Sequence, residues 1–509
     1  MKKIYKFLLS RGVIFGILIL IQLGAVMGLV WGVGYAYTNT YIILEFLSFV
    51  IAICIINGDR NPSYKLAWLI VMLAVPIFGS IFYLFFGIRH NNFRSKKRMQ
   101  QNETRCKEYL KINDKINEEV NAIDKNIYRH TKYLTQYSYH PLYKNFYTKY
   151  IEDGEKKYIE LIKELKNAKK YIFLEYFIIA KGFMWDGILE ILENKVKEGI
   201  DVRIIYDDFG CLFRLPTNYD KILKSKGIKC QLFNPVVPFI NIYMNHRDHR
   251  KLAIIDGQVA FIGGMNIADE YMNKIHKFGH WKDCNMVVKG ECVWSITVMF
   301  LQMWNFFTIH DNDWSIFKPE YSYQEAHDGY IQPFGDIPID KETITKNAYK
   351  NLITSAKRYV YIETPYLIID NEMIESLTLA AKSGIDVRII CPGIPDKKSI
   401  YLVSKAFFPK LIEAGVKIYI YTPGFMHSKL IVVDDEVGIL GTANMDYRSF
   451  YLHFEAGLWI YKSKVLLDIK EDFLNTLKCC EQLSLVKAKN INIVTKIFQG
   501  ILRIFSPIM

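Results

Sequence analysis

The chain has 509 residues, of which 51% are hydrophobic, 15% aromatic and 23% charged, and its formal net charge is +13. This hydrophobic fraction, together with only 15 prolines, excludes a disordered or low-complexity chain, and the length corresponds to about three domains. The nine cysteines are scattered and never spaced as C-x-x-C, so neither a disulfide scaffold nor a zinc cluster is expected. The excess of basic residues favours an anionic partner, either a nucleic acid or a membrane surface.

The first 90 residues contain three apolar runs, at 12–37, 41–56 and 66–88. The first run is uncharged and long enough to cross a bilayer. A cleaved signal peptide is the competing interpretation, but its apolar core would be too long, and more apolar runs follow at once. Basic residues precede the first run and follow the third, so both flanks are expected in the cytoplasm. Residues 1–90 are therefore predicted to be a membrane anchor with two or three spans.

Two further segments carry helical patterns without a catalytic motif. Residues 91–134 are predicted to be a basic, helical juxtamembrane linker, whose first part is expected to lie on anionic headgroups. Residues 486–509 form an amphipathic segment with apolar side chains at helical spacing. A helix docked on the core and an interfacial membrane helix both fit that segment.

The rest of the chain repeats itself. The first copy contains AKKYIFLEYFII and EGIDVRIIYDD, and the second contains AKRYVYIETPYLII and SGIDVRIICPG in the same order, with Glu175 matching Glu363. The β-branched and aromatic runs predict buried strands, and the stretches between them have a helical period. Strand–helix alternation predicts an α/β domain in each copy, at about 135–330 and 331–485.

Each copy also contains the pattern H-x-K-x4-D-x6-G-x2-N without a gap. One such match would be a weak signal, but two matches at corresponding points of a duplication exclude coincidence. The residues are His249, Lys251, Asp256, Gly263 and Asn266 in the first copy, and His427, Lys429, Asp434, Gly441 and Asn444 in the second.

The spacing of each motif suits an extended strand. Residues two apart point to the same face of a strand, so His249 and Lys251 should lie together, as should His427 and Lys429. Four apolar residues follow each lysine, which places the polar pair at the open end of a buried strand. A metal site is disfavoured, because each histidine has a cation rather than a second ligand two residues on.

An imidazole beside an ammonium group favours an anion, and phosphate is the obvious one. Two half-sites would let one neutral imidazole attack phosphorus while the other, protonated, gives its proton to the leaving oxygen. The two lysines would stabilise the non-bridging oxygens, as Asn266 and Asn444 could by hydrogen bonding, so no metal or other cofactor is expected.

Each nucleophilic or acidic imidazole needs a group that holds its tautomer. Asp283 and Glu455 are the candidates, because each stands at the start of an apolar strand after its motif. Asp256 and Asp434 are also candidates for a catalytic role, but a structural role as buried caps fits them equally well.

At these residues the sequence resembles the phospholipase D superfamily, whose hallmark is this duplicated motif. The phrases NGDRNPSYKLAWLIVMLAVPIFGSIFYLFFG, NHRDHRKLAIIDG and RIFSPIM resemble the bacterial cardiolipin synthases within it. The resemblance implies two tandem α/β sandwich domains of phospholipase D type, related by a pseudo-twofold axis, with one active site between them. One departure is Gly264, where many relatives have serine; the second copy has Thr442.

The resemblance also implies a reaction. A phosphatidyl group would pass between two phosphatidylglycerol molecules through a phosphohistidine, giving cardiolipin and glycerol. His249 is the expected nucleophile and His427 the expected general acid, although the symmetry of the motif leaves the reverse open. The expected location is the bacterial cell membrane, as a multi-pass protein with its site facing the cytoplasm and anionic lipids as partners.

Three alternatives differ in function. A membrane-bound phospholipase D-type hydrolase, or a phosphatidyl transferase with another acceptor, would use the same residues. A nuclease of the same superfamily suits the net charge, but the apolar runs argue against nucleic acid as a partner. A non-catalytic membrane scaffold is disfavoured by two complete motifs.

Overall fold

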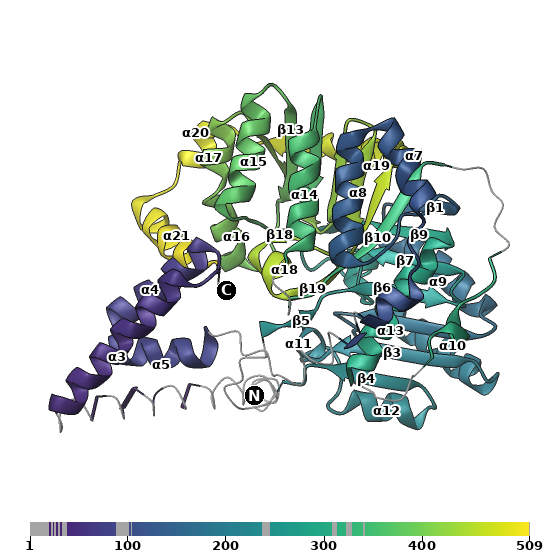
Figure 1. Ribbon diagram of the computed structural model, residues 1–509, viewed down its shortest axis with the longest axis horizontal. Helices are drawn as coiled ribbons and strands as arrows, with labels where there is room; N and C mark the ends of the chain where they lie inside the picture. Colours follow the sequence, from purple (N-terminus) through teal and green to yellow (C-terminus); the bar gives the residue numbers. More distant parts are fainter. Residues whose placement is uncertain are drawn as a thin grey trace. The chain divides into compact units, whose positions relative to one another are not determined.

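The computed structural model describes residues 38–87, 101–102, 104–236, 245–307, 313–321, 328–338 and 342–507, with seven further positions between 20 and 32. Two compact units are present (Figure 1). One unit comprises residues 1–92, 234–246 and 493–509, and the other comprises residues 93–233 and 247–492.

The smaller unit is helical. Its helices are α3 (Thr38–Asn57), α4 (Pro62–Ala74), α5 (Pro76–Phe86) and α21 (Ile493–Phe505). Pro76 cannot continue α4, because proline lacks an N–H and disfavours helical geometry in the residue before it, so the apolar run 66–88 divides into α4 and α5. Trp68 packs edge-on against Tyr83 with ring centroids 5.3 Å apart, and α21 contacts α4.

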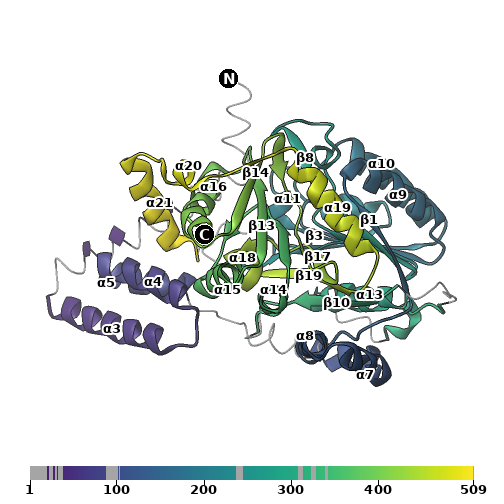
Figure 2. The same ribbon diagram turned by 90° about the horizontal axis from the view of Figure 1, so that it is seen from above.

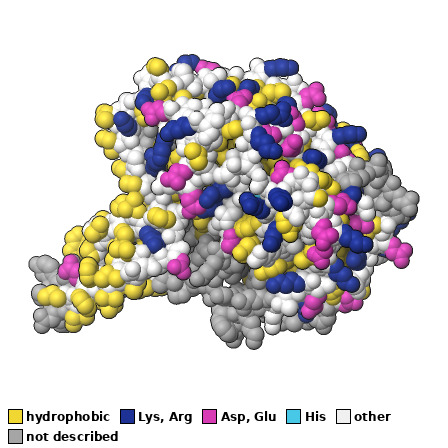
Figure 3. Space-filling model, turned by 45° about the horizontal axis from the view of Figure 1, so that its top comes forward, with side chains coloured by type: hydrophobic (Ala, Val, Ile, Leu, Met, Phe, Trp, Pro, Cys, Tyr) yellow, Lys and Arg dark blue, Asp and Glu magenta, His cyan; other side chains and the backbone are white. Residues whose placement is uncertain are grey.

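The surface of α3 is unusually apolar. Hydrophobic side chains cover much of the exposed surface of the smaller unit (Figure 3), and on α3 they are Ile42, Ile43, Phe46, Leu47, Phe49, Val50, Ile53 and Ile56. Among the residues that the structure describes, no helix is both long enough and apolar enough to cross a bilayer. Most of the first apolar run, 12–37, lies outside those residues.

The first copy of the duplication forms a seven-stranded sheet in the order β1-β9-β7-β6-β2-β3-β4. The adjacent strands β2, β3 and β4 are parallel, and all the other neighbours are antiparallel. The strands are β1 (Phe146–Ile151), β2 (Tyr171–Tyr176), β3 (Asp201–Asp207), β4 (Lys229–Phe233), β6 (Lys251–Ile255), β7 (Val259–Gly263) and β9 (Asn285–Gly290).

The second copy repeats this order as β10-β19-β17-β16-β11-β13-β14, with β20 (Cys480–Gln482) added at the edge. The parallel and antiparallel pairs fall at the same places, which confirms the predicted duplication. The strands are β10 (Tyr330–Asp336), β11 (Tyr359–Glu363), β13 (Asp386–Pro392), β14 (Lys417–Tyr421), β16 (Leu430–Val433), β17 (Val437–Gly441) and β19 (His453–Tyr461).

The two sheets share one hydrophobic core. Alternate residues of β2 face opposite sides: Ile172 and Leu174 pack against α9 (Gly154–Asn167) and α10 (Phe183–Lys197), which lie side by side (Figure 2). Tyr171 and Phe173 face the other side, where one buried cluster includes residues of both sheets. Helices α13 (Cys292–Phe307) and α19 (Val465–Leu477) join this cluster, and each contacts strands of both copies.

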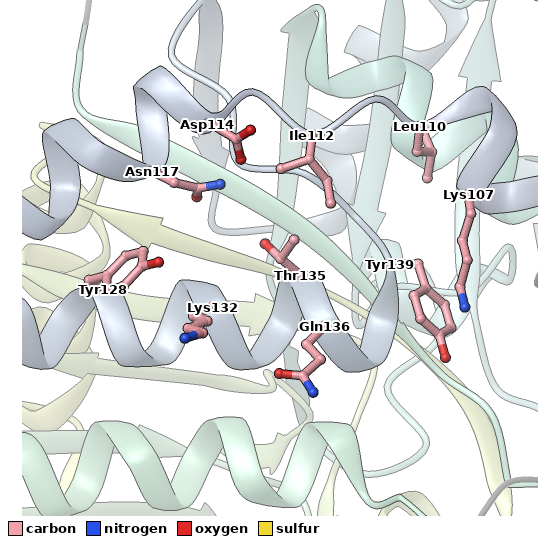
Figure 4. Close-up of a pocket in the computed structure, with 10 residues that line it drawn as sticks. All are labelled: Lys107, Leu110, Ile112, Asp114, Asn117, Tyr128, Lys132, Thr135, Gln136 and Tyr139. Atoms are coloured by element: carbon pink, nitrogen blue, oxygen red, sulfur yellow. The ribbon is translucent and has the colours of Figure 1, made fainter.

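The described part of the predicted linker is largely helical and packs on the second copy of the duplication. Helices α7 (Asp114–Ile123) and α8 (Lys125–Ser138) form a hairpin, and α8 packs on β10 and on α14 (Ile344–Ser355). The hairpin and the segment before it line an open cavity of about 460 Å³ (Figure 4). Its lining, which includes Lys107, Asn117 and Tyr139, contains no residue of either motif, so this cavity is separate from the predicted phosphate site.

Candidate active site

The two motifs occupy equivalent places in the two sheets. Lys251 opens β6 and Lys429 immediately precedes β16, and both strands are buried throughout. Each histidine lies two residues before its lysine, and in an extended chain this spacing puts both side chains on the same face. The side chains of all four residues are buried, His249 and His427 being only 6% and 7% exposed. The predicted pairing of each histidine with its lysine therefore agrees with the strand geometry.

The segment before each histidine crosses to the other copy. Strand β5 (Arg247–Asp248) pairs in parallel with the start of β19 in the second copy, and the His249 N–H donates to the Phe454 carbonyl oxygen at 3.0 Å. Strand β15 (Gly424–Met426) pairs in parallel with β8 (His280–Lys282) of the first copy, and the His427 N–H donates to the Lys282 carbonyl oxygen at 2.7 Å. These two exchanges bring both motifs to the junction of the copies.

Because of this crossing, each histidine meets the carboxylate of the other copy. The Nδ1 atom of His249 lies 2.9 and 3.1 Å from the two carboxylate oxygens of Glu455. The Nδ1 atom of His427 lies 2.5 Å from Asp283 Oδ2. A carboxylate accepts a hydrogen bond only from a protonated Nδ1, so both pairs favour the tautomer that leaves Nε2 free to react. Asp283 and Glu455 were both predicted as orienters, but the exchange of partners between copies was not.

Burial and the neighbouring lysines favour the uncharged form of both imidazoles. Burial, together with the nearby Lys429, lowers the pKa of His427 to about 4. Burial, then Lys251, likewise hold the pKa of His249 well below its usual value. Burial also lowers the pKa of Lys251 to about 7 and that of Lys429 to about 8. Each ammonium group donates to the carbonyl oxygen of its own motif histidine, which turns the lysines toward the histidines.

Binding of sulfate, a phosphate mimic that carries no titratable proton at neutral pH, is expected to take up about one proton per site. A bound anion raises the pKa of every cationic group that it contacts, and the His427 imidazole starts well below neutrality. Isothermal titration calorimetry in two buffers of different ionisation enthalpy measures this uptake. Release of protons, or no exchange, would contradict the assignment of this pocket as an anion site.

The two asparagines are engaged in hydrogen bonds within the protein. Asn266 accepts the Ile178 N–H at 2.9 Å and donates to the Tyr271 hydroxyl at 2.6 Å. Asn444 donates to the Asp446 carboxylate at 3.1 Å, and its own carbonyl oxygen is buried without a hydrogen-bond partner among the described residues. Each amide retains one N–H in addition to the one engaged, so a contact to phosphate stays a prediction.

Asp256 and Asp434 make their hydrogen bonds away from the motif histidines, which favours the structural role over the catalytic one. Each follows the far end of its strand, about 23 Å along an extended chain from the motif histidine. Asp256 accepts the N–H groups of residues 169–171 at 2.7 to 2.9 Å, and Asp434 accepts those of residues 357–359 at 2.6 to 2.8 Å. Both cap the start of a neighbouring strand, which is the structural alternative.

Replacing Asp434 with alanine is therefore expected to destabilise the protein without slowing catalysis. Three backbone N–H groups lose a charged acceptor, at a cost of about 1–3 kcal/mol in the free energy of unfolding. Urea unfolding followed by tryptophan fluorescence measures the loss, and activity is compared well below the unfolding midpoint. A large fall in activity at unchanged stability would restore the catalytic assignment.

The departure at Gly264 has a steric reason. A Cβ atom at Gly264 would lie 2.1 Å from Asp283 Oδ1, so the first copy has no room for a side chain there. In the second copy Thr442 occupies the equivalent position, and its hydroxyl donates to Glu455. The hydroxyl at this position thus contacts the carboxylate that orients His249.

Aromatic rings enclose both histidines, and the sequence motifs did not point to them. Phe177 lies edge-on to His249 with centroids 5.0 Å apart, whereas Trp281 lies 5.1 Å from His427. His453 was also missed, and its ring centroid is 5.2 Å from that of His249. It stands two residues before Glu455, so the same-face rule for strands could have identified it.

The fold and the paired motif define a protein of the phospholipase D type, and comparisons with known proteins agree. The family model described as "Cardiolipin synthase, PLD-like domain" matches residues 161–304 and 349–477, and one described as "Phospholipase_D-nuclease N-terminal" matches residues 46–87. The chain belongs to the cardiolipin synthase family of phospholipase D-like proteins.

Relatives match over most of the chain. A cardiolipin synthase of Halalkalibacterium halodurans is 36% identical over 468 residues, covering 90% of this chain and 92% of that protein. An uncharacterized protein of Streptococcus mutans is 41% identical over 456 residues, covering 89% of this chain and 98% of that one. The fold is similar to that of the phosphatidylserine synthase of Haemophilus influenzae, with a TM-score of 0.57 at 16% identity, covering 74% of this chain and 97% of that chain.

Proposed function

We propose that the protein is a cardiolipin synthase that transfers a phosphatidyl group from one phosphatidylglycerol to another, giving cardiolipin and glycerol. One observation carries the proposal: two buried imidazoles, each held by a carboxylate of the other copy, meet beside two buried lysines. This arrangement suits a phosphodiester, which needs a nucleophile, an acid and positive charge at one place. Membership of the family supplies the class of substrate.

The first half-reaction forms a covalent intermediate. The Nε2 atom of His249 attacks phosphorus, the bond from phosphorus to the glycerol oxygen breaks, and His427 gives its proton to that oxygen. Glu455 stabilises the positive charge that develops on the His249 imidazole, because it accepts the hydrogen bond from Nδ1. Lys251 and Lys429 stabilise the non-bridging oxygens. The resemblance favours this assignment of the two histidines over its reverse.

The second half-reaction reverses these roles. A glycerol hydroxyl of the second phosphatidylglycerol gives its proton to the now neutral His427 and attacks phosphorus. The bond from phosphorus to His249 breaks, and cardiolipin leaves. Water in place of that hydroxyl would give phosphatidic acid, so a phospholipase D-type hydrolase uses the same residues and is the second candidate.

The proposed location is the bacterial cell membrane, with the site facing the cytoplasm and the first 90 residues as the anchor. The apolar exposed surface of α3 supports attachment to lipid. The C-terminal helix α21 also supports it, since Ile493, Ile497 and Ile501 are exposed, while Lys496 and Arg503 supply positive charge for anionic headgroups.

Lipid analysis tests the proposal directly. The purified full-length protein is incubated with vesicles of phosphatidylglycerol, and the lipid and water-soluble products are identified. Cardiolipin with glycerol is the expected result. Phosphatidic acid with glycerol would make the protein a hydrolase, and no conversion would overturn both candidates.

A further inference from the structure

The two half-sites differ chemically at one position. The residue two before the orienting carboxylate is His453 in the second copy and Trp281 in the first. Each of these rings packs on the motif histidine beside it, with centroids 5.2 Å from His249 and 5.1 Å from His427. Both half-sites therefore have a ring at this position, but only the ring of His453 offers a nitrogen that can bind a metal.

His453 is built into that half-site without an evident partner for its Nδ1 atom. The residue is only 8% exposed, and within the described part of the chain its Nδ1 atom is buried and makes no hydrogen bond. That atom lies 3.8 Å from Glu455 Oε1, which is itself 2.9 Å from His249 Nδ1. Ligand atoms of the three residues all lie within 4.8 Å of one another.

Two imidazoles and one carboxylate are the ligand set of many zinc sites. Tetrahedral Zn²⁺ with bonds of about 2.0–2.2 Å needs ligand atoms about 3.4 Å apart, so the set would have to contract by about 1.4 Å at most. A fourth position would remain for water or a substrate oxygen. Imidazole ligands favour Zn²⁺ and similar transition metals over Mg²⁺ or Ca²⁺, which prefer oxygen.

We propose that His249, His453 and Glu455 form a site for Zn²⁺ or a similar transition metal, and that occupation of this site inhibits the enzyme. The ligand geometry stands by itself, whereas the inhibition rests on the proposed role of His249. A bound ion engages the nucleophile and withdraws Glu455 from its orienting hydrogen bond. The ion must bind beside Lys251 and Lys429, whose positive charge lowers its affinity. No equivalent site is expected at His427, because Trp281 stands where the other half-site has His453.

The test is a zinc titration of cardiolipin formation by the full-length protein in phosphatidylglycerol vesicles. Zn²⁺ is expected to inhibit the wild-type protein, and an equal concentration of Mg²⁺ is not. The zinc-free rate of His453→Gln serves as its own reference, and relative to that rate the variant should need at least about tenfold more Zn²⁺ for half inhibition. His276→Gln, which changes an exposed histidine, is the matched control and should keep the wild-type sensitivity. Equal zinc sensitivity of His453→Gln and wild type would overturn the proposal.

Metal binding is also measured without catalysis. Co²⁺ added to the wild-type protein should give the intense visible absorption of a tetrahedral ion, and His453→Gln should lose it. A chelator should leave the basal activity unchanged or raise it. If lipid conversion fails while the Co²⁺ band depends on His453, the proposed function is wrong and the metal site stands. Absence of the band from the wild-type protein would overturn the site itself.

Discussion

Replacing His249 with alanine is expected to lower the rate of cardiolipin formation by about 10⁴-fold or more, and replacing His427 is expected to do the same. Each variant loses one half of the acid–nucleophile pair, and the remaining histidine cannot attack phosphorus and protonate the leaving oxygen at once. The rate is measured with phosphatidylglycerol vesicles. His276→Ala, an exposed substitution of the same type, should leave it unchanged.

A substrate with a better leaving group separates the two roles. Nitrophenol leaves phosphorus without a proton, so phosphatidyl-nitrophenol needs the nucleophile but no general acid. His427→Ala should therefore still release one equivalent of nitrophenol and retain the phosphatidyl group on the protein, whereas His249→Ala should release none. The opposite pattern would make His427 the nucleophile. Normal turnover by both variants would contradict the paired-histidine mechanism.

The fold was predictable because its signals are local and repeated. The same-face rule placed each histidine beside its lysine, and matching strand runs in the two copies became two sheets with one strand order. Strand and helix periods of 2 and 3.6 residues depend only on neighbouring residues, so they can be recognised in a single sequence. The crossing of β5 and β15 has no such signal, because each crossing strand is only two or three residues long.

The structural role of Asp256 was also within reach of the sequence. Asp-Gly between two apolar strands is a strong hairpin signal, and Asp256 adopts a positive φ of 54° before Gly257 in the turn from β6 to β7. Asp434 occupies the same turn in the second copy with φ of 57°. The turn chemistry of this residue therefore indicates a structural role independently of the motif that contains it.

Exchange of Glu455 for glutamine is expected to lower kcat by about 10²- to 10⁴-fold, and Asp283→Asn should have an effect of the same order. An amide can turn its NH₂ group toward Nδ1, and it then stabilises the tautomer whose Nε2 carries the proton. It also lacks the charge that stabilises an imidazolium. Asp434→Asn is the matched control, because it makes the same carboxylate-to-amide change at a position that caps a strand. Its effect should appear in the free energy of unfolding and leave kcat unchanged.

Because each carboxylate holds the histidine of the other copy, the two carboxylate variants should differ in which step of the reaction they slow. Because Glu455 holds His249, Glu455→Gln should behave like the nucleophile variant and release nitrophenol slowly. Because Asp283 holds His427, Asp283→Asn should behave like the acid variant and release nitrophenol at nearly the wild-type rate, while cardiolipin formation falls. If each carboxylate instead served the histidine of its own copy, the two phenotypes would be exchanged. The nitrophenol burst therefore reads out, in solution, which copy supplies the carboxylate for each histidine.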